Sequence, residues 1–175
     1  MTNNSDFVKG YSIWLIPEDE TCKKLQAEID HLSRHFSSPP FIPHITLLGQ
    51  LDMEEEVVRR KFFELSTAAN QMTLGLGEIV YQDVFFRSIV YHVEETETLM
   101  ELNQMARSKF GRDSDPPFFP HLSLLYSHEG EAAKRHAINT RGITGPSSII
   151  ISRLELVHTL GRVEDWETIL RSNIK

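Results

Sequence analysis

The sequence predicts an α+β fold that is built from two related halves. Residues 39–48 read PPFIPHITLL and residues 116–125 read PPFFPHLSLL, so seven of the ten positions are identical. The histidines of the two copies lie 77 residues apart, from 44 to 121, which is too far for a solenoid repeat and indicates a duplicated half-domain. Apolar runs typical of strands alternate with segments of helical period, in an order that mixes hairpins with crossovers. This order favours α+β over a doubly wound α/β fold.

The first half contains two predicted strands and two predicted helices. Residues 11–16 form a short apolar run before Pro17, which predicts a strand. Residues 18–36 have an acidic start and apolar side chains at spacings of three and four, which predicts a helix. The first copy of the repeat is expected to be a strand. Residues 53–70, with apolar side chains on one face, are expected to form the second helix.

The second half is expected to follow the same order. Its predicted elements are strands at 73–81 and 84–93 around a turn at Gln82 and Asp83, a helix at 96–110, a strand from the second copy of the repeat, a helix at 129–139, and closing strands at 148–158 and 166–171. No Gly-rich linker separates the halves. Residues 1–175 are therefore expected to form a single domain of two intimately packed lobes.

The charge balance and the composition argue against several classes of protein. With 18 basic and 25 acidic residues the formal net charge is −7, which counts against a long nucleic acid as the partner. No apolar run approaches the ~20 residues of a membrane span, and the polar N-terminus has no signal-peptide core. Cys22 is the only cysteine, so an internal disulfide is excluded. We therefore expect a cytoplasmic monomer with no membrane partner.

Each copy of the repeat carries a histidine followed two residues later by a hydroxyl side chain: His44 with Thr46, and His121 with Ser123. Because side chains alternate faces along a strand, the two members of each pair point the same way, roughly 6–7 Å apart. The residue between them points into a core. Two such strands side by side would line one groove with two imidazoles and two hydroxyls.

These groups are the ones that metal-free hydrolysis of a phosphodiester requires. One imidazole takes a proton from water, the other protonates the departing sugar oxygen, and the hydroxyls hydrogen-bond the non-bridging oxygens. A histidine serves in either role because its unperturbed pKa is ~6.5. A single histidine on a strand is more often structural, but a structural need rarely demands the same pattern twice. We therefore predict that His44, Thr46, His121 and Ser123 are catalytic.

The motifs FIPHITL and FPHLSLLY resemble those of the two-histidine phosphoesterase superfamily. Three further features are similar to its cyclic phosphodiesterase branch, which includes plant and fungal enzymes. These are the opening YSIWLIPE with Trp14, Tyr126 five residues after the second histidine, and the closing WETI that starts at Trp166. The resemblance spans nearly the whole chain. The second motif has serine in place of threonine, which keeps the hydroxyl.

The resemblance implies a bilobal LigT-like fold with a pseudo-twofold repeat, in which antiparallel sheets line a central cleft and helices lie outside. It implies hydrolysis of ADP-ribose 1″,2″-cyclic phosphate, and of nucleoside 2′,3′-cyclic phosphates to 2′-phosphates, with no metal and no cofactor. The partner would be a small cyclic nucleotide, with Trp14 and Tyr126 in substrate binding. His121 would be the base and His44 the acid. Core packing is the alternative role of the two aromatic residues.

Four other residues have both a functional and a structural interpretation. Cys22 has the chemistry of a nucleophile, but no neighbour in sequence would activate it. His31 and His35 are four apart on a predicted helix and could share a metal, but the HExxH glutamate is missing and histidine is simply favourable near a helix C-terminus. Arg87 lies on a predicted strand beside the groove, where it could meet a phosphate or be solvated.

Two other functions remain open. Relatives with the same paired motifs act on RNA ends or on 2′,5′-linked oligonucleotides, although the acidic balance and the lack of a basic stripe count against a long RNA. A non-catalytic nucleotide sensor is the alternative from another class. Retention of both histidines and both hydroxyls counts against a sensor, which needs affinity alone.

Overall fold

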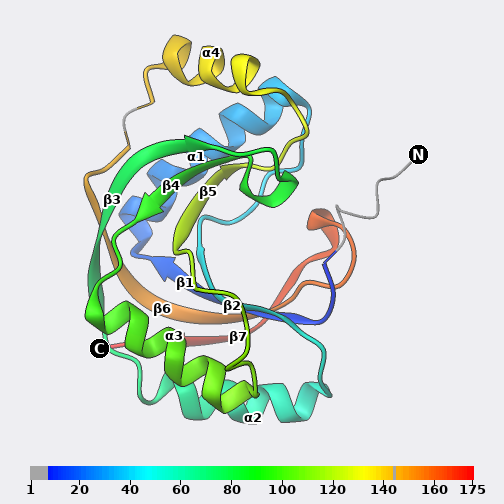
Figure 1. The fold of residues 1–175 in the computed structure, drawn as a ribbon, viewed down its shortest axis with the longest axis vertical. Helices are drawn as coiled ribbons and strands as arrows, with labels where there is room; N and C mark the ends of the chain where they lie inside the picture. Colours follow the sequence, from blue (N-terminus) through cyan, green and yellow to red (C-terminus); the bar gives the residue numbers. More distant parts are fainter. Residues whose placement is uncertain (1–7, 144) are drawn as a thin grey trace.

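Residues 8–143 and 145–175 are described by a computed structural model, and they form four α-helices and seven strands (Figure 1). The elements in chain order are β1 (Tyr11–Pro17), α1 (Asp19–Phe36), β2 (Ile45–Leu51), α2 (Glu55–Ser66), β3 (Met72–Tyr81), β4 (Ile89–Val93), α3 (Glu97–Phe110), β5 (His121–Leu125), α4 (Glu131–Arg141), β6 (Ser148–His158) and β7 (Glu167–Asn173). Short 3₁₀ helices at Phe85–Arg87 and Val163–Asp165 precede β4 and β7. The predicted order of strands and helices is confirmed in both halves.

The strands form one closed antiparallel sheet. Their order is β1-β2-β5-β4-β3-β6-β7, and a further pairing between β1 and β6 closes the first six into a ring. Strand β7 pairs with β6 outside this ring. Exchanging β1 with β4, β2 with β5 and β3 with β6 reproduces every pairing of the ring. The duplication seen in the sequence is therefore also a duplication of the strand connectivity.

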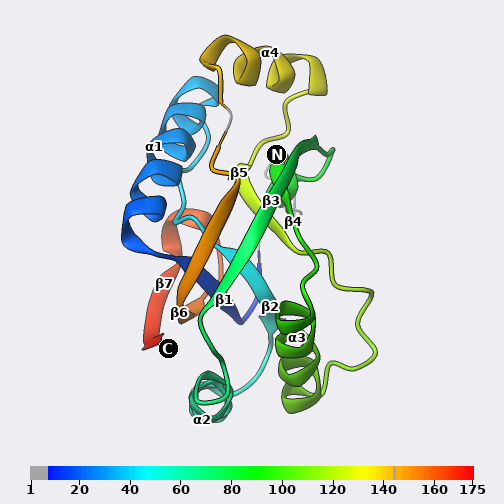
Figure 2. The same ribbon diagram turned by 90° about the vertical axis from the view of Figure 1, so that its left-hand side faces the viewer.

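The helices lie in two pairs at opposite ends of the molecule, α1 with α4 and α2 with α3 (Figures 1 and 2). An ion pair between Arg141 Nε and Glu28 Oε2 at 3.4 Å joins α4 to α1, and one between Lys109 Nζ and Glu64 Oε2 at 2.8 Å joins α3 to α2. The helices therefore follow the same twofold exchange as the strands.

Within residues 8–143 and 145–175, no helix combines the length and the apolar character needed to span a bilayer.

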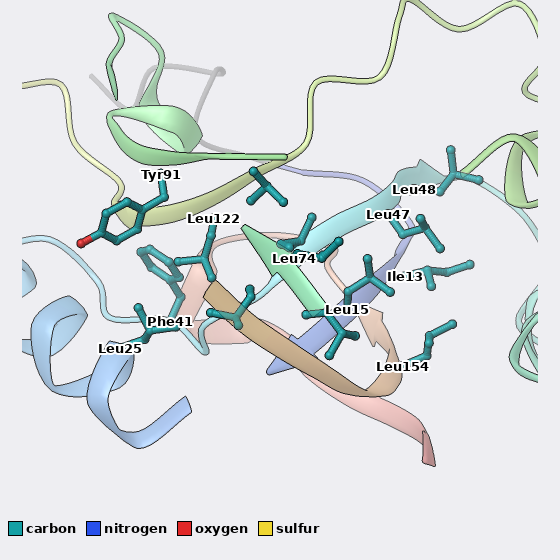
Figure 3. Close-up of a cluster of buried hydrophobic side chains, with 14 of the residues drawn as sticks. Ile13, Leu15, Leu25, Phe41, Leu47, Leu48, Leu74, Tyr91, Leu122 and Leu154 are labelled. Atoms are coloured by element: carbon teal, nitrogen blue, oxygen red, sulfur yellow. The ribbon is translucent and has the colours of Figure 1, made fainter. Parts of the chain in front are cut away.

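The residues between each histidine and its hydroxyl partner anchor the two motifs to the core. Ile45 and Leu122 are fully buried in a hydrophobic cluster to which both halves contribute. Figure 3 shows Leu122 together with Leu47, which continues the apolar face of β2. Because burying one such side chain contributes about 1.5–3 kcal/mol, each strand keeps this face inward. The histidine and the hydroxyl then lie on the opposite face, as the alternation predicts.

The strands from the repeat are shorter than predicted. Strand β2 begins at Ile45 and β5 begins at His121, so the proline-rich first part of each copy is irregular. Proline has no N–H to donate to a strand ladder, and each copy has three prolines before its histidine. The prolines therefore determine where each strand begins.

The prediction of a strand over residues 84–93 is wrong in its first part. The Arg87 N–H donates to the Val84 carbonyl at 2.9 Å, which closes a 3₁₀ turn, and the Gln82 N–H donates to the Ser88 carbonyl at 3.1 Å. The chain therefore forms a compact loop between β3 and β4 in place of a tight hairpin turn. This loop brings Arg87 and its neighbours to the face of the sheet that carries the histidines.

Candidate active site

One cavity of about 350 Å³ has all four side chains of the two motifs in its wall. They come from the start of β2 and the start of β5, which are neighbours in the closed sheet. The sequence could place each histidine beside its own hydroxyl, but only the fold brings the two pairs together. Other residues that line this cavity are Ser12, Trp14, Gln50, Arg87, Tyr126 and Trp166.

The register of β2 against β5 sets the spacing of the four groups. The middle residues of the two motifs, Ile45 and Leu122, are antiparallel partners. Continuing this register by one residue in each direction sets each histidine opposite the hydroxyl residue of the other motif. Directly opposed side chains in an antiparallel pair have Cβ atoms about 4.5–5.5 Å apart. Two imidazoles and two hydroxyls are therefore held within reach of one phosphate group.

The ring orientation of both histidines is set by the same backbone contact. His44 Nδ1 lies 2.5 Å from the carbonyl oxygen of Ile42, and His121 Nδ1 lies 2.8 Å from that of Phe119. A carbonyl oxygen only accepts, so Nδ1 must carry the proton in each ring. The neutral imidazole then has a bare Nε2, which is available to accept or to hold a transferable proton. Each acceptor is two residues before its histidine, with a proline between them.

Burial acts on both imidazoles. His44 is 5% exposed, and Trp14 stacks on it with ring centroids 3.7 Å apart and planes 8° apart. Burial lowers the pKa of His44 to about 4, since the charged ring loses its hydration. The pKa of His121 is lowered as well, mainly by burial and further by the nearby Arg87 guanidinium. Both imidazoles are therefore neutral at pH 7 when no substrate is bound.

Ser123 and Tyr126 form a chain of hydrogen bonds in the cavity wall. The Ser123 hydroxyl donates to the Phe86 carbonyl at 3.0 Å, and Ser123 also hydrogen-bonds the Tyr126 side chain. The hydrogen bond with Ser123 ties the Tyr126 hydroxyl to the second motif. Burial raises the pKa of Tyr126, which keeps its hydroxyl protonated. In contrast, the Thr46 hydroxyl has no hydrogen-bond partner within the described residues.

The two predicted substrate-binding aromatic residues lie in the wall of this cavity. Trp14 and Tyr126 are each 3% exposed. One face of Trp14 is covered by His44, and one face of Tyr126 is covered by Phe41 at a centroid distance of 3.7 Å. The rings therefore have little free surface for stacking on a nucleobase. The geometry favours the interpretation that they close the wall and orient the polar groups.

Arg87 is brought into the cavity by the 3₁₀ helix that the sequence did not predict. Its guanidinium forms no ion pair with the residues that the structure describes. Cys22 does not line this cavity, and burial raises the pKa of its thiol, which disfavours a nucleophilic thiolate. His31 and His35 line a separate cavity with His136. Over residues 8–143 and 145–175, no group of three or more His, Cys, Asp or Glu side chains could hold a metal ion.

Several lining residues had no recognisable signal in the sequence. Ser12, Gln50 and Thr159 come from three different strands or strand ends, and they meet only because β1 lies between β2 and β6. Phe86 contributes through its backbone carbonyl, which no side-chain pattern reveals. The proline before each histidine was the one available signal of the backbone contact at Nδ1.

Comparison of the sequence with known families and proteins gives three findings. A family model described as "Cyclic phosphodiesterase-like protein" matches residues 9–174. The chain is 25% identical to a cyclic phosphodiesterase of Arabidopsis thaliana over 94% of both chains. It is also 25% identical to a 2′,3′-cyclic-nucleotide 3′-phosphodiesterase of Phaeosphaeria nodorum, over 91% of this chain and 96% of the relative.

Among solved structures, E. coli LigT in complex with 3′-AMP is similar in fold. The TM-score is 0.60, with 20% sequence identity over 95% of this chain and 98% of LigT. The closed antiparallel sheet with its helices is therefore a LigT-like fold.

Burial of His44 should make the folded protein sensitive to acid. The pKa of His44 is about 4 in the folded state and ~6.5 in the unfolded state, so between these values the unfolded state binds more protons. The free energy of unfolding should therefore fall as the pH falls from 6.5 to 4, by about 3 kcal/mol from this residue. Urea denaturation at pH 7.5 and pH 4 measures the loss, which His44→Asn should reduce.

The exposed His136 provides the matched control for this measurement. His136→Asn changes an exposed histidine outside the cavity, so the acid-induced loss should stay as large as in the wild type. An acid-induced loss that is the same in the wild type and in the His44 variant would contradict the effect of burial.

Proposed function

The chain belongs to the cyclic phosphodiesterase-like protein family, and from this premise we propose that it hydrolyses the cyclic phosphate of a small nucleotide in the cavity at β2 and β5. One observation carries the proposal: both imidazoles have Nδ1 bound to a backbone carbonyl and lie with both hydroxyls in one cavity wall. The names of the plant and fungal relatives support the same reaction class.

In this proposal the two histidines exchange protons with water and with the leaving oxygen. One Nε2 accepts a proton from the attacking water as the P–O bond to the sugar breaks, and the other Nε2 protonates that sugar oxygen. Thr46 donates to a non-bridging oxygen, where negative charge concentrates. Ser123 donates to another once its hydroxyl rotates away from the Phe86 carbonyl, and its hydrogen bond with the Tyr126 side chain orients it.

The roles of base and acid can be assigned to His44 and His121 in two ways. The resemblance of the motifs favours His121 as the base and His44 as the acid. The deeper burial of His44 favours the reverse, because a base must be unprotonated at the working pH and the pKa of His44 is about 4 in the free protein. In either assignment the negative charge of the bound phosphate raises the pKa of the acid and loads its proton.

The substrates we favour are nucleoside 2′,3′-cyclic phosphates, opened to 2′-phosphates, and ADP-ribose 1″,2″-cyclic phosphate. A protein of net charge −7 needs a local positive group to hold a phosphate, and Arg87 supplies one in the cavity wall. We assign Arg87 to phosphate binding, and Trp14 and Tyr126 to the shape of the site. The two halves would act as lobes on either side of the bound nucleotide, in a cytoplasmic monomer.

The first test is a substrate panel in the presence of EDTA. The wild-type protein should hydrolyse nucleoside 2′,3′-cyclic phosphates or ADP-ribose cyclic phosphate without added metal, because imidazoles and hydroxyls supply the chemistry. His44→Ala and His121→Ala should each reduce turnover by about 10²–10⁴-fold, the usual value of a proton-transfer group. Product formation is followed by chromatography.

Three outcomes of this panel would count against the proposal. Loss of turnover in EDTA that zinc or manganese restores would contradict metal independence. Consumption of 2′,5′-oligoadenylate alone would indicate the oligonucleotide branch. Nucleotide binding without any turnover would indicate a sensor.

The second test concerns Arg87. Arg87→Met should reduce kcat/KM for cyclic phosphates by about 10–100-fold, because a charge-assisted contact to phosphate is lost, and Arg87→Lys should restore part of it. The exposed Arg60, outside the cavity, provides a control with the same change of charge in Arg60→Met. Equal effects of the two methionine variants would show that Arg87 acts only through the net charge.

The third test is the pH profile. At low pH the base is blocked and at high pH the acid is spent, so the rate should rise and then fall. The profile of kcat/KM reports the free protein, where the pKa of His44 is about 4 and that of His121 is below its ordinary value of ~6.5. Its maximum should therefore lie on the acidic side of neutrality. The falling limb of the kcat profile should lie at higher pH than that of the kcat/KM profile, because bound phosphate raises the pKa values of both histidines.

The two limbs belong to the coupled pair, so variants are needed to assign them. Replacing the acid should flatten the high-pH limb, and replacing the base should flatten the low-pH limb. A kcat/KM that climbs steadily to pH 9 would exclude a histidine acid.

A further inference from the structure

Strand β2 carries a β-bulge at the edge of the cavity. Ile13 pairs with Leu48 and Tyr11 pairs with Leu51, so the single residue between the partners on β1 faces two residues on β2, Gly49 and Gln50. A bulge of this kind leaves the extra residue out of the ladder and redirects its side chain. Both bulge residues line the cavity.

The bulge holds Gln50 in a backbone conformation that a non-glycine residue rarely adopts. Its φ is 55°, in the left-handed region. Arg112, just after α3, donates through Nη1 to the carbonyls of Gly49 at 3.2 Å and Gln50 at 3.1 Å. Arg112 is itself held by Asp115, with Nε 2.8 Å from Oδ1. A strained conformation persists only where surrounding contacts enforce it, and such residues cluster at ligand sites.

The bulge is in direct contact with the first motif. A Cβ atom added to Gly49 would lie 3.4 Å from the Thr46 methyl group and 3.4 Å from Ser12 Oγ. A side chain at position 49 would be in ordinary contact with Thr46, so the bulge lies close to the first motif, and Gln50 lines the same cavity as that motif. The Gln50 side chain is exposed, and its amide has no hydrogen-bond partner within the described residues. The backbone of Gln50 is thus fixed at the cavity, while its amide is exposed to solvent and free to bind a ligand.

The chemistry of the amide indicates what it binds. A phosphate offers only acceptors, so it would leave the carbonyl oxygen of a glutamine unused, whereas nucleobase edges present donors and acceptors side by side. Ser12 adds an acceptor. Thr159 Oγ1 donates to the Gly10 carbonyl at 3.2 Å, so Ser12 donates to Thr159 at 3.1 Å and keeps its lone pairs free.

We propose that Gln50 is a specificity-determining residue that hydrogen-bonds the nucleobase edge of the substrate, and that Arg112 is its positioning residue. The bulge fixes the backbone from which the amide projects, and the side chain itself becomes ordered when it binds the base. This inference rests on the proposed hydrolysis of nucleoside cyclic phosphates.

The experiment compares substrates that have a base with one that has none. The kcat/KM values are measured for the four nucleoside 2′,3′-cyclic phosphates and for the 2′,3′-cyclic phosphate of a methyl riboside. Gln50→Glu replaces the amide donor by an acceptor. It should lower kcat/KM for the preferred nucleotide about 5–50-fold, as expected for a lost or unsatisfied hydrogen bond, and should change the order of the four bases. Hydrolysis of the riboside reports only the effect of the added charge in the cavity, so it should fall by a clearly smaller factor than hydrolysis of the preferred nucleotide.

Two further variants separate recognition from folding. Gln50→Gly should lose the same base preference while raising Tm by about 2–4 °C, because glycine adopts this φ without strain. Arg112→Met should weaken the same base preference, and Arg112→Lys should restore part of it. In a protein that already carries Gln50→Gly, Arg112→Met should not change the base preference further. Gln71→Glu, at an exposed glutamine outside the cavity, is the control for added charge and should preserve the base preference.

The outcomes distinguish this inference from the proposed function. Suppose that the wild type hydrolyses the nucleotides. If Gln50→Glu then changes kcat/KM for the riboside and for every nucleotide by the same factor, or leaves all of these values unchanged, the role of Gln50 is overturned while the proposed function stands. If the wild type hydrolyses no cyclic phosphate, both fail. A lower Tm for Gln50→Gly together with an unchanged base preference would show that the bulge is only structural.

Discussion

The antiparallel pairing of β2 with β5 is the constraint on which the site depends. It joins the two copies of the repeat and is one of the six pairings that close the sheet. Ile45 and Leu122, the partners at this junction, are fully buried, so the histidines and hydroxyls lie on the other face. A slip of one residue would exchange the two faces of a strand. The apolar core therefore holds the two histidines and the two hydroxyls in register from the face opposite the cavity.

Within that frame, local contacts determine the protonation chemistry. The bond from Nδ1 of each histidine to a backbone carbonyl leaves Nε2 without a proton in the neutral ring, and the cavity wall desolvates both rings. Desolvation costs stability in acid, yet it also makes each imidazole responsive to the charge of a bound anion. The stack of Trp14 on His44 limits ring motion on one side. Stability and reactivity at this site are therefore set by the same burial.

The electrostatics of the site differ from those of the whole chain. The protein has a net charge of −7, but Arg87 lies in the cavity wall without an ion-pair partner in the part of the chain that the structure describes. A short loop, rather than a basic surface, supplies the positive charge. This arrangement fits a small anion better than a polynucleotide, whose binding needs many phosphate contacts. The bulge at Gln50 adds a neutral hydrogen-bonding group to the lining of the same cavity.

The sequence by itself determined the duplicated order of strands and helices, and it determined that each histidine shares a strand face with its hydroxyl partner, because strand period is a local property. Only the tertiary structure decided how these parts meet. The 3₁₀ helix that carries Arg87, the covered faces of Trp14 and Tyr126, and the left-handed conformation of Gln50 all depend on which strands are neighbours. A periodic pattern reports which face of an element is apolar. It does not report what packs against that face, or where an extra residue is accommodated in a closed sheet.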